Sequence, residues 1–120
     1  MCSSRSLGLL LPLLGLMAAC SKSPTPEEVC EREVPTSPPY FEPGSVAAGT
    51  PRETTREAIV AHCVRRWTAL RTVSKERYKC ETQCQAGDAG DDCYERCVSD
   101  FPVSGSDLAK EEARLKATGK

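Results

Sequence analysis

Residues 80–97 read CETQCQAGDAGDDCYERC, and this stretch decides the fold. A spacing of four places Cys80 and Cys84 on one face of a helix, about 6 Å apart along its axis, and does the same for Cys93 and Cys97. Two such helices joined by eight residues fold as an antiparallel hairpin. In that register we expect Cys84 to pair with Cys93 and Cys80 with Cys97. Each bridge would contribute about 2–4 kcal/mol.

The residues that flank the cysteines indicate where these helices begin and end. Ser74 is expected to cap a helix from about Lys75 to Ala86, although residues 71–74 contain no strong breaker and one long bent helix is the alternative. The turn that follows is rich in glycine and aspartate. Within it, we expect Asp91 to cap the helix that carries the second pair of cysteines.

Two similar start signals precede the hairpin. In Thr25-Pro26-Glu27-Glu28, a threonine cap, a proline at the first helical position and a glutamate two residues later predict a short helix. Pro35 ends it and opens a proline-rich loop over residues 35–49. Thr50-Pro51-Arg52-Glu53 repeats the signal, so we expect a second helix to begin there.

The second helix is the strongest secondary-structure prediction. Ile59, Cys63, Trp67 and Leu70 follow one another at steps of four, four and three, so one face of the helix is apolar. Trp67 is expected to be the central core residue, because a large aromatic side chain on an apolar stripe is usually buried.

Cysteine parity completes the pairing. The chain has eight cysteines. If Cys2 is removed with the signal peptide and Cys20 carries the lipid, or if later cleavage removes both, six remain, enough for three bridges among 15 formal pairings. With the hairpin bridges assigned, Cys30 pairs with Cys63 by elimination.

The composition explains why bridges are needed. From Cys20 onward the large apolar residues number eight Val, one Ile, three Leu, two Phe and one Trp, against 15 basic and 17 acidic residues. With so few large apolar residues the chain can bury only a small core, and disulfides must supply part of the stability. We therefore predict an all-α fold, a disulfide-stapled helical hairpin or bundle. We expect a signal peptide over residues 1–19, a flexible tether over 20–26, the stapled domain over 27–100 and a charged, loosely docked or free tail over 101–120.

The N-terminus has the pattern of an export signal. Arg5 precedes an apolar stretch from Leu7 to Leu16 that is too short to span a bilayer, and small residues lead into Cys20. The segment Leu16-Met17-Ala18-Ala19-Cys20 resembles the lipobox of bacterial lipoproteins, with Met17 where leucine is usual. This resemblance implies a membrane anchor of diacylglycerol and palmitate on Cys20. The alternative is ordinary cleavage after Ser21, which would release a soluble protein.

Two further resemblances concern the fold. The paired cysteines resemble, in architecture only, the small mitochondrial Tim chaperones and the plant alpha-hairpinins. The segment Thr25-Pro26-Glu27-Glu28-Val29-Cys30 and the region from Cys63 to Cys97 are similar to small cysteine-rich lipoproteins of deltaproteobacteria such as myxobacteria. That resemblance covers about two thirds of the mature chain, and it implies location and fold but no activity.

No constellation predicts catalysis or a cofactor. Exported cysteines separated by three residues favour disulfides over a zinc site, and the Cys-x-x-Cys motif of redox enzymes is absent from the sequence. His62 adjoins Cys63, but neighbouring helical residues point about 100° apart, and we expect His62 to be a surface residue. The acidic turn lacks the calcium pattern. We therefore predict no enzyme, no metal and no cofactor.

Two classes of function remain. The formal net charge of −1 argues against nucleic-acid binding. We expect an envelope lipoprotein with a non-catalytic binding or structural role. Its expected partners are the membrane, through the lipid anchor, and an envelope protein of unknown identity. Because Ser21 rather than aspartate follows the lipidated cysteine, the resemblance to Gram-negative lipoproteins implies the outer membrane, facing periplasm or surface. The competitor is a soluble secreted disulfide-rich effector or enzyme inhibitor.

Overall fold

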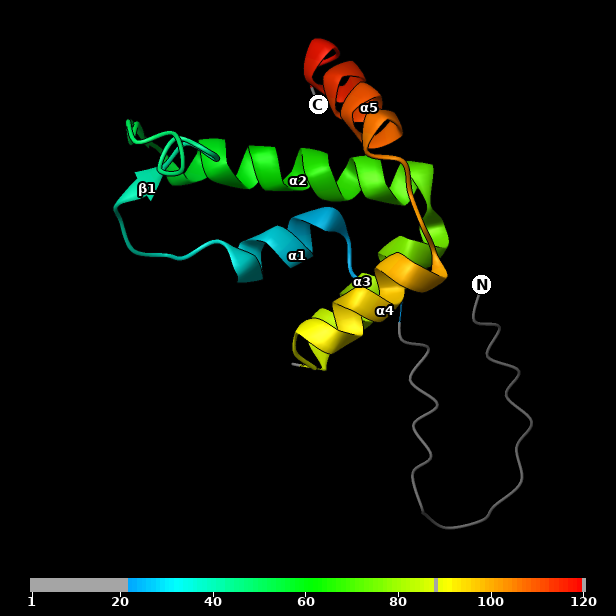
Figure 1. Cartoon of the computed structure of the whole chain (residues 1–120). Helices are drawn as coiled ribbons and strands as arrows, with labels where there is room; N and C mark the ends of the chain where they lie inside the picture. Colours follow the sequence, from blue (N-terminus) through cyan, green and yellow to red (C-terminus); the bar gives the residue numbers. More distant parts are fainter. Residues whose placement is uncertain (1–21, 88, 120) are drawn as a thin grey trace, which may run out of the picture.

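The chain folds mainly into helices, as a computed structural model that describes residues 22–87 and 89–119 shows (Figure 1). The all-α expectation is confirmed. The predicted signal peptide and lipobox, Cys20 included, lie outside the described residues. The elements are α1 Pro26–Glu33, β1 Tyr40–Phe41, β2 Glu53–Thr54, α2 Arg56–Val73, α3 Lys75–Ala86, α4 Asp91–Asp100 and α5 Gly105–Ala117.

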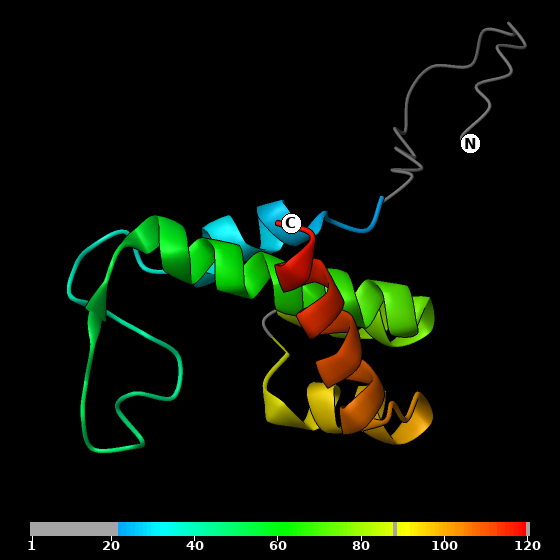
Figure 2. The same cartoon turned by 90° about the horizontal axis from the view of Figure 1, so that it is seen from above.

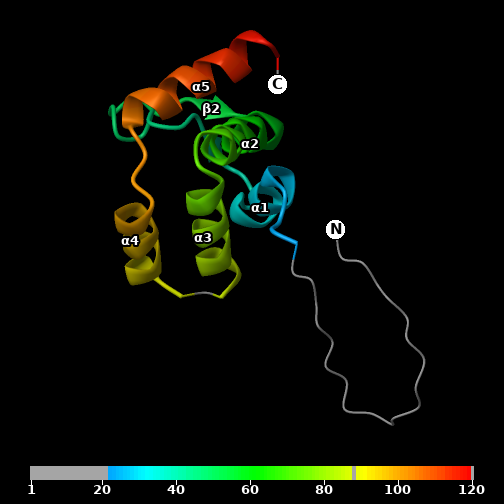
Figure 3. The same cartoon turned by 90° about the vertical axis from the view of Figure 1, so that its right-hand side faces the viewer.

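Helix α2 is the centre of the arrangement. Helix α1 packs along one side of it and α5 crosses the opposite side (Figure 1). Helices α3 and α4 stand side by side as a hairpin that extends from the end of α2 (Figure 3). The segment between β1 and β2 projects away from the helices near the start of α2, as the view from above shows (Figure 2). Helices α1, α3 and α5 thus pack directly on α2, and α4 packs on α3.

Helix α1 begins as its sequence predicts. The Thr25 Oγ1 accepts a hydrogen bond from the Glu28 N–H at 3.2 Å, and the Thr25 N–H donates to Glu28 Oε2 at 2.7 Å. This reciprocal capping box satisfies two backbone groups that the helix leaves open. Val29 and Cys30 on its inner face are fully buried against α2.

Helix α2 begins later than predicted. Its N-cap is Thr55, whose Oγ1 accepts a hydrogen bond from the Ala58 N–H at 3.2 Å. The expected start at Thr50 is wrong, because Glu53 and Thr54 form β2 and pair antiparallel with β1. The Glu42 N–H donates to the Arg52 carbonyl at 2.9 Å and closes the loop before the helix can begin.

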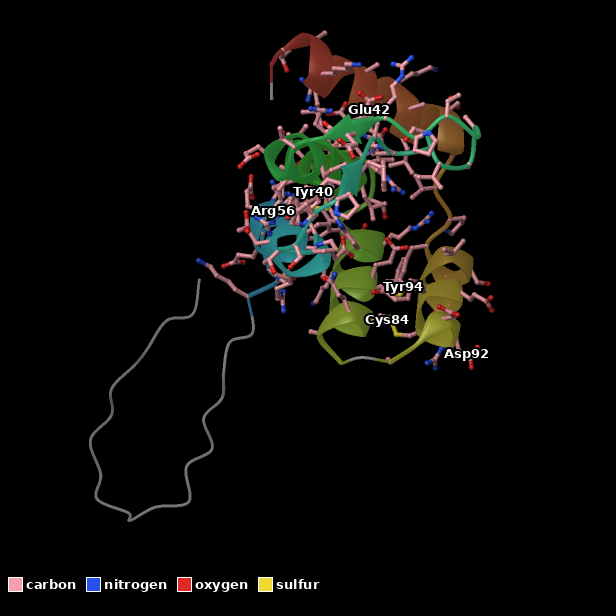
Figure 4. All side chains as sticks on the ribbon, turned by 90° about the vertical axis from the view of Figure 1, so that its left-hand side faces the viewer. Tyr40, Glu42, Arg56, Cys84, Asp92 and Tyr94 are labelled. Atoms are coloured by element: carbon pink, nitrogen blue, oxygen red, sulfur yellow. A yellow bond between two sulfur atoms is a disulfide. The ribbon has the colours of Figure 1, made fainter. Side chains whose placement is uncertain are left out.

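Arg56, the first residue of α2, holds the end of α1. Its guanidinium donates to the carbonyl oxygens of Glu31, Val34 and Pro35 at 3.2–3.4 Å. It also forms an ion pair with the Glu31 carboxylate at 3.0 Å. A cation at the C-terminal end of a helix satisfies free carbonyls and complements the helix dipole. Arg56 therefore fixes α1 against the start of α2, near β1 (Figure 4).

The hairpin helices are separate elements. Ser74 ends α2 and caps α3, accepting a hydrogen bond from the Arg77 N–H at 3.2 Å, so the single bent helix is not formed. The expected cap of α4 by Asp91 is wrong. Gly90 takes the cap position with a φ of +72°, which glycine adopts readily, and Asp91 becomes the first helical residue.

The disulfides join Cys30 to Cys63, Cys80 to Cys97 and Cys84 to Cys93, which is the pairing that the hairpin register and elimination predict. Their Cα atoms lie 5.8, 5.6 and 5.7 Å apart, within the usual range for disulfides. One bridge fastens α1 to α2, and the other two form the rungs between α3 and α4.

The buried core is small and partly made of sulfur. Trp67 is only half-buried, so the expectation that it is the central core residue is wrong. Tyr78 on α3, which is 3% exposed, meets the Trp67 ring edge-on at a centroid distance of 5.8 Å. The buried apolar residues of the described chain, besides Pro26, are Val29, Cys30, Val34, Ala69, Leu70, Tyr78, Cys84, Cys97 and Leu115.

The C-terminal segment differs from the expected loose tail. Helix α5 packs across α2 and buries Leu115 to 4% exposure. Leu108, seven residues earlier and on the same helical face, is half-buried. These two aligned leucines give α5 an apolar stripe. Phe101, which follows α4, is 36% exposed.

Candidate functional site

A cavity of about 360 Å³ lies where α2, α3 and α5 meet, and it is the best candidate for a binding site in the described chain. Helix α2 supplies one wall, and α3 and α5 supply two others. The end of α1 and the loop between β1 and β2 (residues 42–52), called the projecting loop below, complete the cavity. The lining residues are Glu33, Pro43, Ile59, His62, Cys63, Arg66, Trp67, Leu70, Arg77, Glu81, Leu108 and Glu112.

Glu33, the last residue of α1, organises one side of the cavity. Its Oε2 accepts a hydrogen bond from the Trp67 Nε1–H at 3.0 Å, and its Oε1 accepts one from the Gln85 Nε2–H at 2.6 Å. A single carboxylate therefore joins α1, α2 and α3. This contact also explains why the indole of Trp67 stays near the surface, since its N–H needs a polar partner.

Two ion pairs of different character line the cavity. Arg77 and Glu81 lie 3.5 Å apart on α3, and their side chains are only 16% and 12% exposed. The buried Arg77 Nε makes no hydrogen bond within the described residues. Arg66 on α2 and Glu112 on α5 are 3.9 Å apart and well exposed, so their mutual attraction is weak. Arg66 is thus available to a ligand at the cavity mouth.

His62 adds an uncharged polar group to the cavity. Partial burial lowers the pKa of His62 below its usual 6.5, and the positive charges of Arg65 and Arg66 lower it further. The neutral imidazole can both donate and accept a hydrogen bond. Cys63 beside it is bonded to Cys30, so its sulfur is no free thiol that His62 could activate. We expected His62 to be a surface residue, and its side chain is half-buried.

The predicted disulfide cysteines form two compact groups of possible metal ligands. The sulfurs of Cys80, Cys84 and Cys97 lie within 4.8 Å of one another, as do the ligand atoms of Cys30, Glu33 and Cys63. Each of these sulfurs is part of a disulfide, and zinc binds the thiolate form of cysteine. In the oxidised chain the cysteines of both groups therefore act as crosslinks and offer no thiolate to a metal ion.

Sequence reasoning identified the cysteines and Trp67 but missed the polar residues that shape the cavity. Glu33, Arg77 and Gln85 lie on helices whose sequences show no pattern that separates a polar residue with side-chain partners from a fully solvated one. Tyr78 was missed for the same reason, because its helical neighbours at steps of three and four are Lys75 and Thr82.

No helix among residues 22–87 and 89–119 is both long and apolar enough to cross a bilayer. Comparison with protein-family models, with curated proteins and with solved structures finds no match.

Proposed function

We propose that the chain is a lipoprotein of the bacterial cell envelope, acylated at Cys20, whose disulfide-stapled helical domain has a non-catalytic binding or structural role. The proposal combines the lipobox-like sequence with three features of the described domain. These are the three disulfides that crosslink its helices, the separation of four residues in sequence between Cys20 and the Pro24 carbonyl that Tyr78 contacts, and the cavity at the junction of α2, α3 and α5.

The observation that carries the proposal is the contact that fixes the start of the domain. The Tyr78 hydroxyl on α3 donates a hydrogen bond to the carbonyl of Pro24, only four residues after Cys20. An extended chain spans at most about 3.3–3.6 Å per residue, so four residues reach about 14 Å. An acylated Cys20 would therefore hold the domain against the membrane surface, with the start of α1 nearest to the lipid.

The cavity is the part of the domain that we expect to bind. Its apolar side chains, including Trp67, lie next to opposite charges and a neutral imidazole. Such a lining suits a peptide segment of another envelope protein that offers an apolar side chain beside a carboxylate. Arg66 at the mouth, with its weak pairing to Glu112, would meet that carboxylate. A near-neutral chain gives no electrostatic reason to expect nucleic acid.

The anchor is tested by the intact mass of the protein purified from the membrane fraction. We expect a chain that begins at Cys20 and carries diacylglycerol and a further acyl chain. A Cys20→Ser variant should remain unacylated. A chain in the soluble fraction that begins at Lys22 would contradict the proposal.

The binding role is tested separately by chemical crosslinking of the acylated protein in intact cells. Arg66→Glu reverses a charge at the cavity mouth, whereas Arg96→Glu reverses one on the exposed surface of α4. We expect Arg66→Glu to abolish a crosslinked species that the wild type and Arg96→Glu both form. Equal crosslinking by all three proteins would exclude the cavity as the binding site.

The second candidate is a soluble secreted effector or enzyme inhibitor, and the projecting loop favours it. Its ends are joined by the Glu42–Arg52 backbone hydrogen bond, and Val46 within it is 60% exposed. A closed loop on a disulfide-stapled scaffold is a suitable contact surface for another protein. The N-terminus and cell fraction of the mature chain distinguish this candidate from the anchored one.

A further inference from the structure

The two disulfides of the α3–α4 hairpin touch each other. Cys84 Sγ lies 3.5 Å from Cys97 Sγ, although each is bonded to a different partner. Because both sulfurs are oxidised, this contact is not a hydrogen bond but a van der Waals approach of two bridges. The three sulfurs of Cys80, Cys84 and Cys97 lie within 4.8 Å of one another, and the sulfur of Cys93 is not part of this group. Figure 4 shows Cys84 between α3 and α4.

The four sulfurs differ in how easily they are reached. Cys84 and Cys97 are buried, at 2% and 0% exposure. Cys93 and Cys80 are half-buried, and Cys93 follows the exposed Asp92 in the first turn of α4. Access decides which sulfur of a disulfide an external thiolate attacks. Attack on the Cys84–Cys93 bond is therefore favoured at Cys93, which makes Cys84 the leaving group.

We propose that the hairpin is a disulfide relay, in which a dithiol reductant attacks Cys93 and the reaction ends with a Cys84–Cys97 disulfide and thiols at Cys80 and Cys93. The inference concerns a modification site that differs from the cavity, and it does not depend on acylation of Cys20. The chemical class of partner is a dithiol, either a small molecule or an oxidoreductase of the envelope.

The relay takes three exchanges, and atoms and electrons balance in each. First, a reductant thiolate bonds to the Cys93 sulfur, the Cys84–Cys93 bond breaks, and Cys84 leaves as a thiolate. Second, the Cys84 thiolate attacks Cys97, the Cys80–Cys97 bond breaks, and Cys80 leaves as a thiolate that takes a proton from water. Third, the second thiol of the reductant attacks the mixed disulfide and releases Cys93 as a thiol. The reductant is oxidised to its disulfide, and the protein gains two electrons.

The contact geometry favours the second exchange through proximity. A thiolate formed at Cys84 is buried and already in contact with the Cys97 sulfur, so a rotation of the freed Cys84 side chain brings it into line with the Cys80–Cys97 bond. Burial also disfavours the charged thiolate, and transfer of that charge to the half-buried Cys80 relieves the cost. The hairpin keeps one bridge throughout, which preserves the α3–α4 contact while two thiols become reachable.

The relay is tested with two matched full-length variants expressed with their export signal and purified in the oxidised form. Cys93→Ser leaves Cys84 without its partner, and Cys84→Ser leaves Cys93 without its partner. Each protein is incubated at neutral pH, quenched in acid, alkylated under denaturing conditions without reduction, and mapped by mass spectrometry. In Cys93→Ser we expect alkylation to be divided between Cys84 and Cys80. In Cys84→Ser we expect it on Cys93 alone.

Alkylation of Cys93→Ser on Cys84 alone would overturn the relay, and so would alkylation of Cys84→Ser on Cys80 or Cys97. The wild type provides a second measurement in case a variant folds poorly. With one equivalent of dithiothreitol, the native protein should yield a peptide joined through Cys84 and Cys97, while the Cys30–Cys63 bridge stays intact. Recovery of the Cys80–Cys97 peptide with thiols at Cys84 and Cys93 would contradict the proposal.

Discussion

Tyr78 and Glu33 each connect parts of the chain that are far apart in the sequence. Tyr78 reaches the Pro24 carbonyl across 54 residues, and Glu33 reaches Gln85 across 52. In a domain with so few buried apolar residues, single polar contacts of this kind make a larger share of the stability than they would in a large core. The predictions at residue scale therefore concern polar side chains.

Replacement of Tyr78 by phenylalanine should lower the free energy of unfolding by about 1 kcal/mol, because it removes the hydrogen bond to the Pro24 carbonyl and keeps the ring. Urea denaturation of the oxidised protein measures the change. Tyr94→Phe is the matched control, since it removes the same hydroxyl from a half-buried tyrosine on α4. An equal loss in both variants would contradict the assigned role.

His62 should make the domain less stable in mild acid. Its folded pKa is lowered, first by desolvation and then by Arg65 and Arg66, while Glu112 and Lys116 of α5 act in opposite directions. The folded state therefore binds fewer protons than the unfolded chain near the usual pKa of 6.5. The stability from neutral His62 is present above about that value and is lost as the pH falls through the lower folded pKa.

Two measurements check the effect of His62. A proton NMR titration should give a midpoint for His62 below 6.5. His62→Gln should also lose less stability than the wild type between about pH 7.5 and pH 5. A midpoint at or above the usual value would show that the imidazole is solvated or paired with Glu112.

At the scale of elements, the start of α2 shows how tertiary pairing changes a local signal. Thr50 and Thr55 are both plausible caps by residue type, but only Thr55 accepts a hydrogen bond from the first turn of the helix. The two-stranded pairing of β1 with β2 extends residues 53 and 54 and delays the helix. The helix therefore begins at the first cap that follows the strand.

Thr55→Ala should destabilise the domain by about 1 kcal/mol, through loss of the cap on the Ala58 N–H. Thr50→Ala, at an exposed position in the loop, should leave the free energy of unfolding within about 0.5 kcal/mol of the wild type. Thermal and urea unfolding of both variants measure the difference. The opposite order of the two effects would restore the start predicted at Thr50.

Helix α5 should be a stabilising element. Leu115→Ala removes its most buried side chain and should cost about 2–5 kcal/mol. The matched control is Ala113→Gly, an exposed position two residues earlier, which should cost only about 1 kcal/mol through helix propensity. Similar small losses in both variants, measured by urea denaturation, would support the loosely docked tail.

At the scale of the whole molecule, disulfides replace much of a missing apolar interior. The Cys30–Cys63 bridge closes a separation of 33 residues, whereas Cys84–Cys93 closes only 9. A longer closed loop removes more entropy from the unfolded chain. The bridge between α1 and α2 should therefore contribute more to stability than the inner rung of the hairpin.

Removal of the first bridge by Cys30→Ala with Cys63→Ala should lower the free energy of unfolding by about 3–4 kcal/mol, and Cys84→Ala with Cys93→Ala by about 2–3 kcal/mol. Urea denaturation followed by far-ultraviolet circular dichroism measures both. A smaller loss for the longer loop would show that α1 stays docked through Glu33 and Arg56 without its bridge.

The sequence by itself determined the helical fold class, the first cap at Thr25 and the pairing of six cysteines. These features depend on helix spacing, capping chemistry and parity, all of which act over a few residues or are simple counts. Only the tertiary structure decided the start of α2, the docking of α5, the burial of Tyr78 in place of Trp67 and the polar lining of the cavity. Each of these depends on which side chains meet across helices, and a polar residue such as Glu33 or Gln85 carries no local sign of the partner that it will find.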